Sequence, residues 1–384
     1  KLAVDYPAFI EFFESKGDLH SQERQLQLQE KMLAEKAKQQ RSMEEEIIRN
    51  ETAKIRAIGL TIETKPDWAL QEHCDDMLRY GCTRLELGVQ TLDDRCLKKT
   101  NRGHGLQETI DSFQVAKDMC LKINAHMMLG LPASTLEKDK DSLINLFADE
   151  RFRPDMLKIY PCLVVRGTPL YTMWEKGLFS PITTEQAATI IAECYAHFPR
   201  YVRVMRVQRD IPTTVVHGGV QKSNLRQYVD AECERLGVSS QDIRAREIGF
   251  REGKGYSPGT FHIQVQQFRA SQGEEYFIDV VDESDTLIGF IRLRLPYQSG
   301  LRPEITEDTA LIRELHVYGH TVPVGESGEH QQHKGWGRAL VEKAEQIAQE
   351  QGYGKMAIIS GVGVRAYYRK LGYEREGPYM CKTL

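Results

Sequence analysis

Short apolar runs alternate with longer stretches of mixed polar and apolar residues through the middle of the chain. The apolar runs predict strands at residues 58–63, 84–89, 122–130, 156–165 and 201–207. The stretches between them have the spacing of amphipathic helices, at residues 66–80, 105–120, 138–148 and 183–197. Regular strand–helix alternation predicts a parallel sheet with right-handed crossovers, either doubly wound or curved into a barrel.

The pattern changes at both ends of this region. Residues 21–56 are rich in Glu, Gln, Lys and Arg and contain no Gly or Pro. They predict one or two long helices that pack on the body through a narrow apolar stripe, with a partner-binding helix as the alternative. Residues 237–260 predict a connecting segment. The rest predicts an α+β module, with strands at residues 261–268, 276–282, 287–295, 310–317 and 355–360 and a helix at 335–352.

Composition is typical of a chain with two or three folded domains. Of the 384 residues, 41% are hydrophobic and 28% are charged, so a buried core can form. No apolar run approaches the roughly 18–20 residues of a membrane-spanning helix, so no membrane association is expected. The formal charge is −4. Between residues 200 and 255, however, eleven basic residues stand against seven acidic ones. This excess suits a phosphate-binding cleft, although an ordinary solvated surface has the same composition.

Eight cysteines are scattered along the chain, and none forms a Cys-x-x-Cys pair. The sequence therefore contains neither a zinc knuckle nor a local iron–sulfur loop, and no metal-ligand set is predicted in this chain. The spacing also argues against a disulfide framework. We expect reduced, buried thiols, as in a cytoplasmic protein.

A glycine-rich turn opens the long helix of the C-terminal module. The run Gln332-His-Lys-Gly335-Trp-Gly337-Arg338 follows a strand that ends at Glu314-Leu-His-Val317. Glycines at a helix start let backbone N–H groups approach a pyrophosphate, which the helix dipole also favours. A later run reads Ser360-Gly-Val-Gly-Val-Arg-Ala-Tyr-Tyr-Arg-Lys-Leu-Gly-Tyr373. Together these segments resemble the GNAT acetyltransferases.

This resemblance implies an acetyl-CoA site. Its expected contacts come from the strand end, the glycine turn and the last helix, namely Glu314, Leu315, His316, Val317, Gln332, Gly335, Trp336, Gly337, Arg338, Gly361 and Tyr368. Acyl transfer needs a donor for the departing thiolate, and the hydroxyl of Tyr367 or Tyr368 would be that catalytic donor. Glu314 and His316 are candidates for catalytic acid–base roles, although His316 is equally well explained as a hydrogen-bonded strand residue.

Further motifs follow in order over residues 58–384. They include Thr61-Ile-Glu-Thr-Lys-Pro-Asp67, Tyr80-Gly-Cys-Thr-Arg-Leu-Glu-Leu-Gly-Val-Gln90, Lys158-Ile-Tyr-Pro161, Arg206-Val-Gln-Arg-Asp-Ile-Pro212 and Glu314-Leu-His-Val-Tyr-Gly319. Together they resemble the catalytic subunit of Elongator, a tRNA-modifying radical-SAM/acetyltransferase family. The resemblance implies an N-terminal helical segment at 1–57, a partial radical-SAM-type β/α barrel at 58–236, a linker at 237–260 and a GNAT α+β domain at 261–384.

The resemblance also implies the reaction, the cofactors and the partner. The barrel would bind S-adenosylmethionine beside a [4Fe–4S] cluster, and the GNAT domain would bind acetyl-CoA. The implied activity is that of a tRNA uridine(34) acetyltransferase, in which a 5′-deoxyadenosyl radical activates the acetyl methyl group and 5-carboxymethyluridine forms at the wobble position. The expected partner is the anticodon loop of tRNA and not DNA. A homo-oligomer and an Elongator-type assembly in the cytoplasm are both compatible with the family.

The chain departs from the family in two places. The cluster needs three cysteines near the first strand, and none is present there. We expect that cysteine-rich loop to lie upstream of this sequence, so that this chain alone would not reduce S-adenosylmethionine. The connector lacks the cysteines that relatives often carry, so zinc is not expected in it. Two other function classes stay open: a protein lysine acetyltransferase with a scaffold barrel, and a non-catalytic tRNA-binding remnant.

Polar residues of the barrel are assigned on the same resemblance. Glu63 and Gln90 end adjacent strands and are assigned to S-adenosylmethionine, with helix capping as the alternative. Asn101, Arg102 and His104 would line the same pocket or fix a turn. The predicted RNA contacts are Lys158, Arg166, Arg206, Arg209 and Arg226. We expect both pockets to open onto one shared, positively lined crevice, where the acetyl group meets an extruded base.

Overall fold

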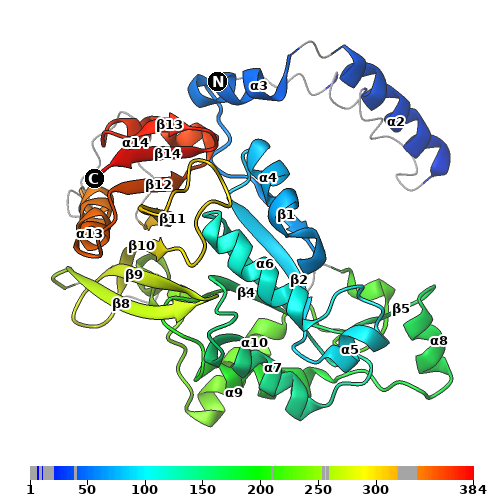
Figure 1. The fold of residues 1–384 in the computed structure, drawn as a ribbon. Coiled ribbons are helices and arrows are strands. Elements are labelled where there is room, and N and C mark those ends of the chain that lie inside the picture. Colours follow the sequence, from blue (N-terminus) through cyan, green and yellow to red (C-terminus); the bar gives the residue numbers. More distant parts are fainter. Residues whose placement is uncertain are drawn as a thin grey trace.

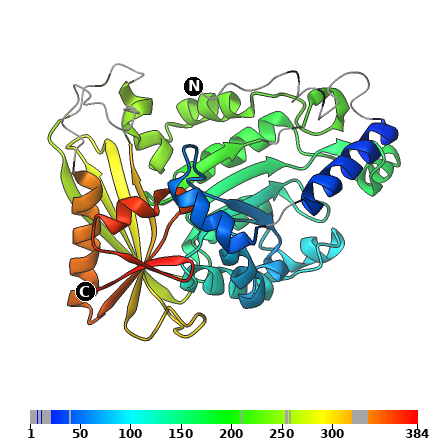
Figure 2. The same cartoon turned by 90° about the horizontal axis from the view of Figure 1, so that it is seen from above.

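Two sheets, one from each half of the chain, organise the molecule and lie side by side (Figures 1 and 2). The structure is a computed structural model that describes residues 7, 11, 21–38, 41–208, 211–252, 256, 259–318 and 335–384. Among the described residues, no helix has the length and apolar character that crossing a membrane takes. All eight cysteines are free thiols, and seven of them are buried.

The first sheet is the predicted partial barrel. Its five parallel strands have the order β1-β2-β3-β4-β6, with bounds Thr61–Thr64, Arg84–Gln90, Lys122–Leu129, Met156–Pro161 and Arg203–Val207. The helices that follow or cover these strands are α4 (Gln71–Arg79), α5 (Asp94–Lys99), α6 (Leu106–Asp118), α7 (Leu136–Ala148), α9 (Thr184–Tyr195) and α10 (Leu225–Leu236). A short pair, β5 (Val164–Val165) and β7 (Val216–Gly218), and helix α8 (Pro169–Glu175) lie beyond the barrel edge.

Strand residues divide between the two faces of this sheet because successive side chains point to opposite sides. Leu85 and Leu87 of β2 and Ile123 of β3 are buried in a core with Phe113 of α6. Most of the intervening residues of the same strands are polar, and they form the opposite face. The predicted strand at 58–63 begins later, at Thr61, since Ile58 is exposed and belongs to the segment that leads into the barrel.

The second sheet has seven strands in the order β13-β14-β12-β11-β10-β9-β8. Their bounds in chain order are β8 His262–Ala270, β9 Gly273–Val281, β10 Leu287–Leu295, β11 Thr309–Val317, β12 Lys355–Ile359, β13 Glu374–Glu376 and β14 Tyr379–Thr383. Strands β11 and β12 pair in parallel, and helix α13 (Trp336–Glu350) packs on the sheet through Leu340, Val341 and Ala344. The short helix α14 (Arg365–Arg369) follows β12. The hairpin of β13 and β14 has no counterpart in the sequence prediction.

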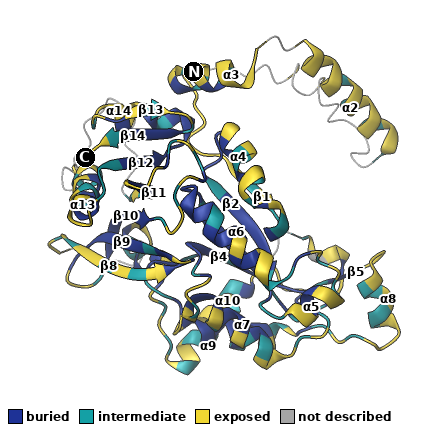
Figure 3. Cartoon of the chain, in the orientation of Figure 1, coloured by how far each residue is buried: buried dark blue, intermediate teal, exposed yellow. Residues whose placement is uncertain are grey.

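The segments outside the two sheets are partly helical. In the predicted connector, α11 (Ile243–Arg246) and α12 (Ile248–Glu252) are short helices. Near the amino terminus, α2 (Gln22–Ala37) has no buried residue and extends away from the body, whereas α3 (Met43–Thr52) buries Ile47 and Glu51 against the second domain (Figure 3). Only α3 therefore has the packed apolar side that was expected of both helices.

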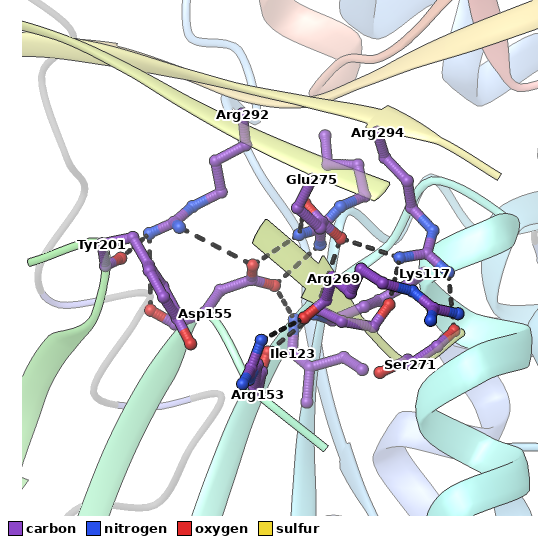
Figure 4. Close-up of polar contacts among 12 residues, drawn as sticks. Lys117, Ile123, Arg153, Asp155, Tyr201, Arg269, Ser271, Glu275, Arg292 and Arg294 are labelled. Carbon is purple, nitrogen blue, oxygen red and sulfur yellow. Dashed lines mark hydrogen bonds and ion pairs between the residues drawn. The ribbon is translucent and has the colours of Figure 1, made fainter. Parts of the chain in front are cut away.

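A buried network of charged side chains joins the two domains (Figure 4). Asp155 lies just before β4, and its two oxygens accept hydrogen bonds from Arg313 of β11 at 2.6 and 2.8 Å. Arg313 also pairs with Glu275 of β9 at 2.8 Å. Glu275 in turn accepts from Arg294 of β10, which donates to Asp118 at the end of α6 at 2.6 Å. Acidic and basic groups thus alternate across the interface.

The members of this network are almost completely removed from solvent. Asp155 is 2% exposed, and Arg313, Arg294 and Asp118 are fully buried. Burial alone would raise the pKa of Asp155, but the charge and hydrogen bonds of Arg313 outweigh it and lower that pKa. Because a buried charge without its partner is costly, the two domains are fixed in the arrangement that pairs every group.

Removing one partner should therefore destabilise the protein strongly. Asp155→Ala leaves two guanidinium groups buried without this carboxylate, and we expect the unfolding free energy to fall by about 3–5 kcal/mol. Arg151→Ala is the control, because Arg151 is 53% exposed and pairs with Asp149 in solvent; it should cost about 1 kcal/mol or less. Denaturant unfolding of both variants measures the difference, and equal midpoints would contradict this role of the network.

Candidate active sites

A cavity of about 540 Å³ lies at the carboxyl ends of the barrel strands. The residues that line it include Glu63 of β1, Gln90 of β2, His126 of β3, Tyr160 of β4 and Arg206 of β6. Parallel strands bring these ends to one edge of the sheet, where α/β proteins bind their ligands. The structure thus brings together Glu63 and Gln90, the two residues assigned to S-adenosylmethionine.

Gln90 has features of a ligand-binding residue. Its φ angle is +71°, in the left-handed region that residues other than glycine rarely adopt. Its Oε1 atom is buried and has no hydrogen-bond partner among the described residues, as is also true of Nε of Arg102, which lines the same cavity. Backbone strain and unsatisfied polar atoms are typical of functional sites. A polar ligand, such as the ribose or methionine part of S-adenosylmethionine, fits these groups.

The other two residues of that turn do not line the cavity. His104 is buried, and burial lowers its pKa. Asn101 is exposed with φ of +53°, so it fixes a turn, which was the alternative reading of this motif.

A buried ionic cluster extends the polar lining into the barrel. Nε2 of His126 lies 2.7 Å from Oε2 of Glu86, and the ammonium of Lys158 pairs with the same carboxylate. Asn124 donates to the other oxygen of Glu86 at 3.3 Å. Burial would raise the pKa of Glu86, but the hydrogen bonds from His126 and Lys158 outweigh it and lower the pKa to about 2. Lys158 lies inside the barrel with its charge paired, so the phosphate contact predicted for it needs correction.

Sequence reasoning missed Glu86 and His126. Their signal was alternation, because Glu86 and His126 occupy polar positions between apolar neighbours on adjacent strands. Such residues face the same side of a sheet and meet there.

The acetyl-CoA site predicted at the start of α13 has the geometry of an anion site. Gly335 adopts φ of +104°, and a Cβ at this position would meet nothing within 4 Å among the described residues. No described side chain caps the helix. A helix N-terminus favours an anion such as a pyrophosphate, so the position of this turn suits the predicted site. Gln332 lies outside the described residues, and Arg338 is exposed and pairs with Glu342 at 2.7 Å.

Tyr367 of α14 faces this first turn. A Cβ at Gly337 would lie only 2.7 Å from the Tyr367 hydroxyl, so the glycine leaves room for that group. Tyr368 is buried and packs against Tyr367 and Tyr373 at ring distances of 5.2 and 6.2 Å. Burial raises the pKa of both Tyr367 and Tyr368, so both phenols stay protonated at neutral pH. Of the two candidate donors, Tyr367 is the one placed beside the glycine turn.

Glu314 and His316 lie at the end of β11. Arg292 donates to Glu314 at 2.8 Å and to the backbone oxygen of Tyr201, just before β6, at 2.7 Å. His316 is exposed, with its ring 4.3 Å from that of Tyr318. Leu315 and Val317 are half-buried against the core of the second domain, between these polar residues.

Gly361 requires a correction. It is buried beneath the N-terminal segment, since a Cβ there would lie 1.9 Å from the backbone oxygen of Ile58. This position is covered by the protein's own backbone and does not suit the acetyl-CoA contact predicted for it.

In the part of the chain that the structure describes, the two sites do not open onto the shared crevice that was expected. Polar residues of the barrel lie between them. The second domain contacts the amino ends of the barrel strands, where Lys122 of β3 donates to the backbone of Arg313 and lies near the charge of Glu314. His126, on the same face of β3, lines the cavity at the carboxyl ends. Lys122 and His126 are four positions apart along the strand, which is about 13 Å. The two sites are therefore at the two ends of one polar sheet face.

Comparisons with known proteins support this pairing of domains. The profile of the radical SAM superfamily matches residues 19–143, that of the radical SAM C-terminal domain residues 154–235, and that of the acetyltransferase (GNAT) family residues 243–373. A solved structure of Elp3 from the archaeon Methanocaldococcus infernus, with an N-terminal deletion, is 43% identical, with a TM-score of 0.85, and covers 90% of this chain and 83% of that one. The chain belongs to the Elongator catalytic subunit family.

Curated members of this Elongator family cover most of the chain. The tRNA uridine(34) acetyltransferase of Methanocaldococcus jannaschii is 45% identical over 89% of this chain, and Elongator complex protein 3 of Danio rerio is 44% identical over 87%. These matches take in 64% and 62% of the relatives' own lengths. This chain thus spans less than two thirds of each.

An iron–sulfur cluster does not fit the residues that this family member presents. Among the described residues, the one group of three potential ligands is Glu63, Glu86 and His126, and Glu86 is already bound to Lys158. None of the eight cysteines takes part in such a group. The carboxylate–histidine group was not foreseen from the sequence.

The predicted RNA contacts do not form one surface. Arg206 lines the barrel cavity, and Arg166 is exposed beyond β5. Arg226 of α10 pairs with the hydroxyl of Tyr195 and lines a different cavity, beside α11. Arg209 lies outside the described residues. Several other basic residues of this region are held by carboxylates, namely Arg200 by Asp285, Arg203 by Glu247 and Arg246 by Asp279. Part of the positive count thus reflects structural ion pairs.

Acid should weaken the Glu86 cluster in a defined range. The pKa of Glu86 is about 2 in the fold against an ordinary 4.5, so its stabilising contribution is complete above about pH 4.5 and is lost as the pH falls toward 2. We expect the wild type to be more stable than Glu86→Gln at neutral pH, with a difference that shrinks below about pH 4.5. Thermal midpoints measured against pH test this. A difference that stays constant down to pH 3 would contradict the pairing.

Gly335→Ala should weaken acetyl-CoA binding at least about tenfold. Alanine is strained at a φ of +104°, so the turn would change shape and lose a hydrogen bond to the phosphate. Losing one hydrogen bond to a charged phosphate costs about 1.5–3 kcal/mol. Gly352→Ala is a matched control just after the other end of α13. Its φ is +86°, and a Cβ there also meets nothing within 4 Å. Both variants carry similar backbone strain, so calorimetric titration should separate them although their melting temperatures fall alike. Equal acetyl-CoA affinities would place the pyrophosphate elsewhere.

Proposed function

We propose that this chain binds acetyl-CoA and S-adenosylmethionine and acts on the wobble uridine of tRNA, as a tRNA uridine(34) acetyltransferase. The observation that carries the proposal is the pair of sites at the two ends of one polar sheet face. The barrel cavity has the strained Gln90 and unsatisfied polar atoms, and the second domain has the glycine turn at the start of α13. The names of the relatives support tRNA as the substrate.

The chain's own residues have separate roles in this proposal. Gln90, Glu63 and Arg102 bind and orient S-adenosylmethionine in the barrel cavity, and the first turn of α13 binds the pyrophosphate of acetyl-CoA. Acetyl-CoA supplies the two-carbon unit as a thioester. When water attacks the thioester carbonyl, a C–O bond forms and the C–S bond breaks, which releases CoA. The protonated Tyr367 hydroxyl donates its proton to the departing thiolate, and Glu314, held by Arg292, accepts the proton of the water.

The radical route expected from the resemblance needs a cluster for which the described residues offer no cysteine set. The proposal for this chain is therefore cofactor binding, thioester activation and recognition of the anticodon loop. Arg206, at the barrel mouth, is the basic residue best placed to meet RNA near the cofactor. Action on tRNA together with eight unpaired thiols supports a cytoplasmic location.

A lysine acetyltransferase with a scaffold barrel is the competing function, and acetyl-CoA turnover separates the two. We expect release of free CoA to rise several-fold with an anticodon stem-loop that carries uridine at position 34. A lysine-rich histone peptide should have no such effect. Stimulation by the peptide alone would favour the lysine acetyltransferase. Stem-loop binding without any turnover would favour the tRNA-binding remnant.

Salt dependence tests the placement of the RNA. Arg206→Gln should weaken stem-loop binding and reduce the slope of log affinity against log salt by about one unit, since one phosphate contact is lost. Arg95→Gln is the control, because Arg95 is 75% exposed on another part of the barrel and pairs with Asp93. An unchanged slope in Arg206→Gln would indicate that the RNA binds elsewhere than at the barrel mouth.

A further inference from the structure

Helix α3 lies outside both sheets and contacts the helix that carries the tyrosines of the acetyl-CoA site. In Figure 1, α3 lies next to α14 and the β13–β14 hairpin, and Figure 2 shows the same neighbours from above. Helix α3 begins with a capping box, in which Ser42 Oγ accepts from the backbone of Glu45 and the Glu45 carboxylate accepts from the backbone of Ser42. It ends at Thr52, directly after Glu51.

The carboxylate of Glu51 binds both ends of α14. One oxygen accepts from Arg365, the first residue of α14, at 2.8 Å. The other accepts from Arg369, the last residue of α14, at 2.5 Å. Glu51 is 8% exposed and Arg365 is 1% exposed, so this half of the double ion pair is shielded from water, whereas Arg369 is 43% exposed. One pair would anchor α3, whereas two pairs at opposite ends of a five-residue helix also restrict how that helix turns.

The backbone after α3 adds a second restraint. Ala57 O accepts a hydrogen bond from Gly363 N at 2.8 Å, immediately before α14. A Cβ at Gly363 would lie 2.5 Å from Cβ of Arg56, so the two backbones touch where only glycine fits. The same segment continues into β1, whose end carries Glu63 of the barrel cavity. The segment thus links the surroundings of both sites.

Any turn of α14 moves Tyr367, which lies midway between the two arginines. The Tyr367 hydroxyl is packed against the first turn of α13, at the position a Cβ of Gly337 would approach to 2.7 Å. A small rotation of α14 would therefore shift this donor relative to the thioester, and shifts of about 1 Å can cost orders of magnitude in rate.

We propose that Glu51 is a positioning residue of the acetyltransferase site, which sets the orientation of α14 and through it of Tyr367. The N-terminal helical segment is then part of that site and not only a surface anchor. The inference rests on the proposed function, since it takes Tyr367 as the donor to the thiolate.

Glu51→Gln tests the proposal. We expect kcat for CoA release with the stem-loop to fall at least about tenfold, a part of the roughly 10²–10⁴-fold that a positioned proton donor contributes. KM for acetyl-CoA should stay within about twofold, because Tyr367 acts on the thiolate only as it forms. Amide hydrogen exchange across α14 should become faster. Glu44→Gln is the matched control, since Glu44 lies on α3 but pairs with Arg375, outside α14, at 2.6 Å.

A double-mutant cycle distinguishes positioning from general destabilisation. If Glu51 acts through Tyr367, Glu51→Gln combined with Tyr367→Phe should be no slower than Tyr367→Phe alone. Multiplying effects, or an unchanged kcat in Glu51→Gln, would overturn the inference. Arg369→Gln removes one of the two ion pairs at a residue that is 43% exposed, so this variant should fold even if Glu51→Gln folds poorly. Its kcat for CoA release should lie between those of the wild type and Glu51→Gln. A wild type that binds no acetyl-CoA would instead sink the proposed function.

Discussion

The alternating ion pairs between the two domains are the interaction on which the rest of the structure depends. Asp155, Arg313, Glu275 and Arg294 are all buried, and each has groups of opposite charge on both sides or is hydrogen-bonded to backbone. Apolar contacts tolerate small displacements, whereas a displacement that separates a buried carboxylate from its guanidinium costs much free energy. The two domains are therefore held in one relative position, and the fold fixes the distances between their sites.

Two sets of polar contacts extend this fixed arrangement to the candidate acetyl-CoA site. Arg292 connects Glu314 of β11 to the backbone of Tyr201 in the barrel, so the barrel sets where the carboxylate points. From the other side, Glu51 of α3 holds the helix of Tyr367. The positions of Glu314 and Tyr367, the two candidate catalytic groups, thus depend on the barrel, on α3 and on the second domain, which are distant in sequence. Only the second domain contains the GNAT motif.

The fold could be predicted from sequence where side-chain pattern decides structure, and the interfaces could not. Alternation in β2 and β3 and the glycines at Gly335 and Gly337 are local features of the sequence, so the strands, the helices and the glycine turn were predictable. Arg313 in a strand carries no sign that its partner is Asp155, more than 150 residues earlier. For the same reason, the basic residues from Arg200 onward suggested a groove, whereas Arg200 and Arg246 are held by carboxylates of the second domain. Gly361 belongs to this class too, because only the passage of Ile58 above it shows why it is glycine.

The polar face of the barrel argues against a scaffold role. Barrel interiors that serve only stability are filled with branched apolar side chains. Here Glu86, Asn124 and His126 occupy the face opposite the helices, and each is less than 5% exposed. Burying such groups costs free energy that even a well-paired cluster only offsets, and an apolar replacement of similar volume would hold the sheet at least as well. The polar residues are therefore better explained by a ligand that needs them. They form a row on one face of the sheet, which runs from the cavity toward Lys122 and, beyond it, Glu314.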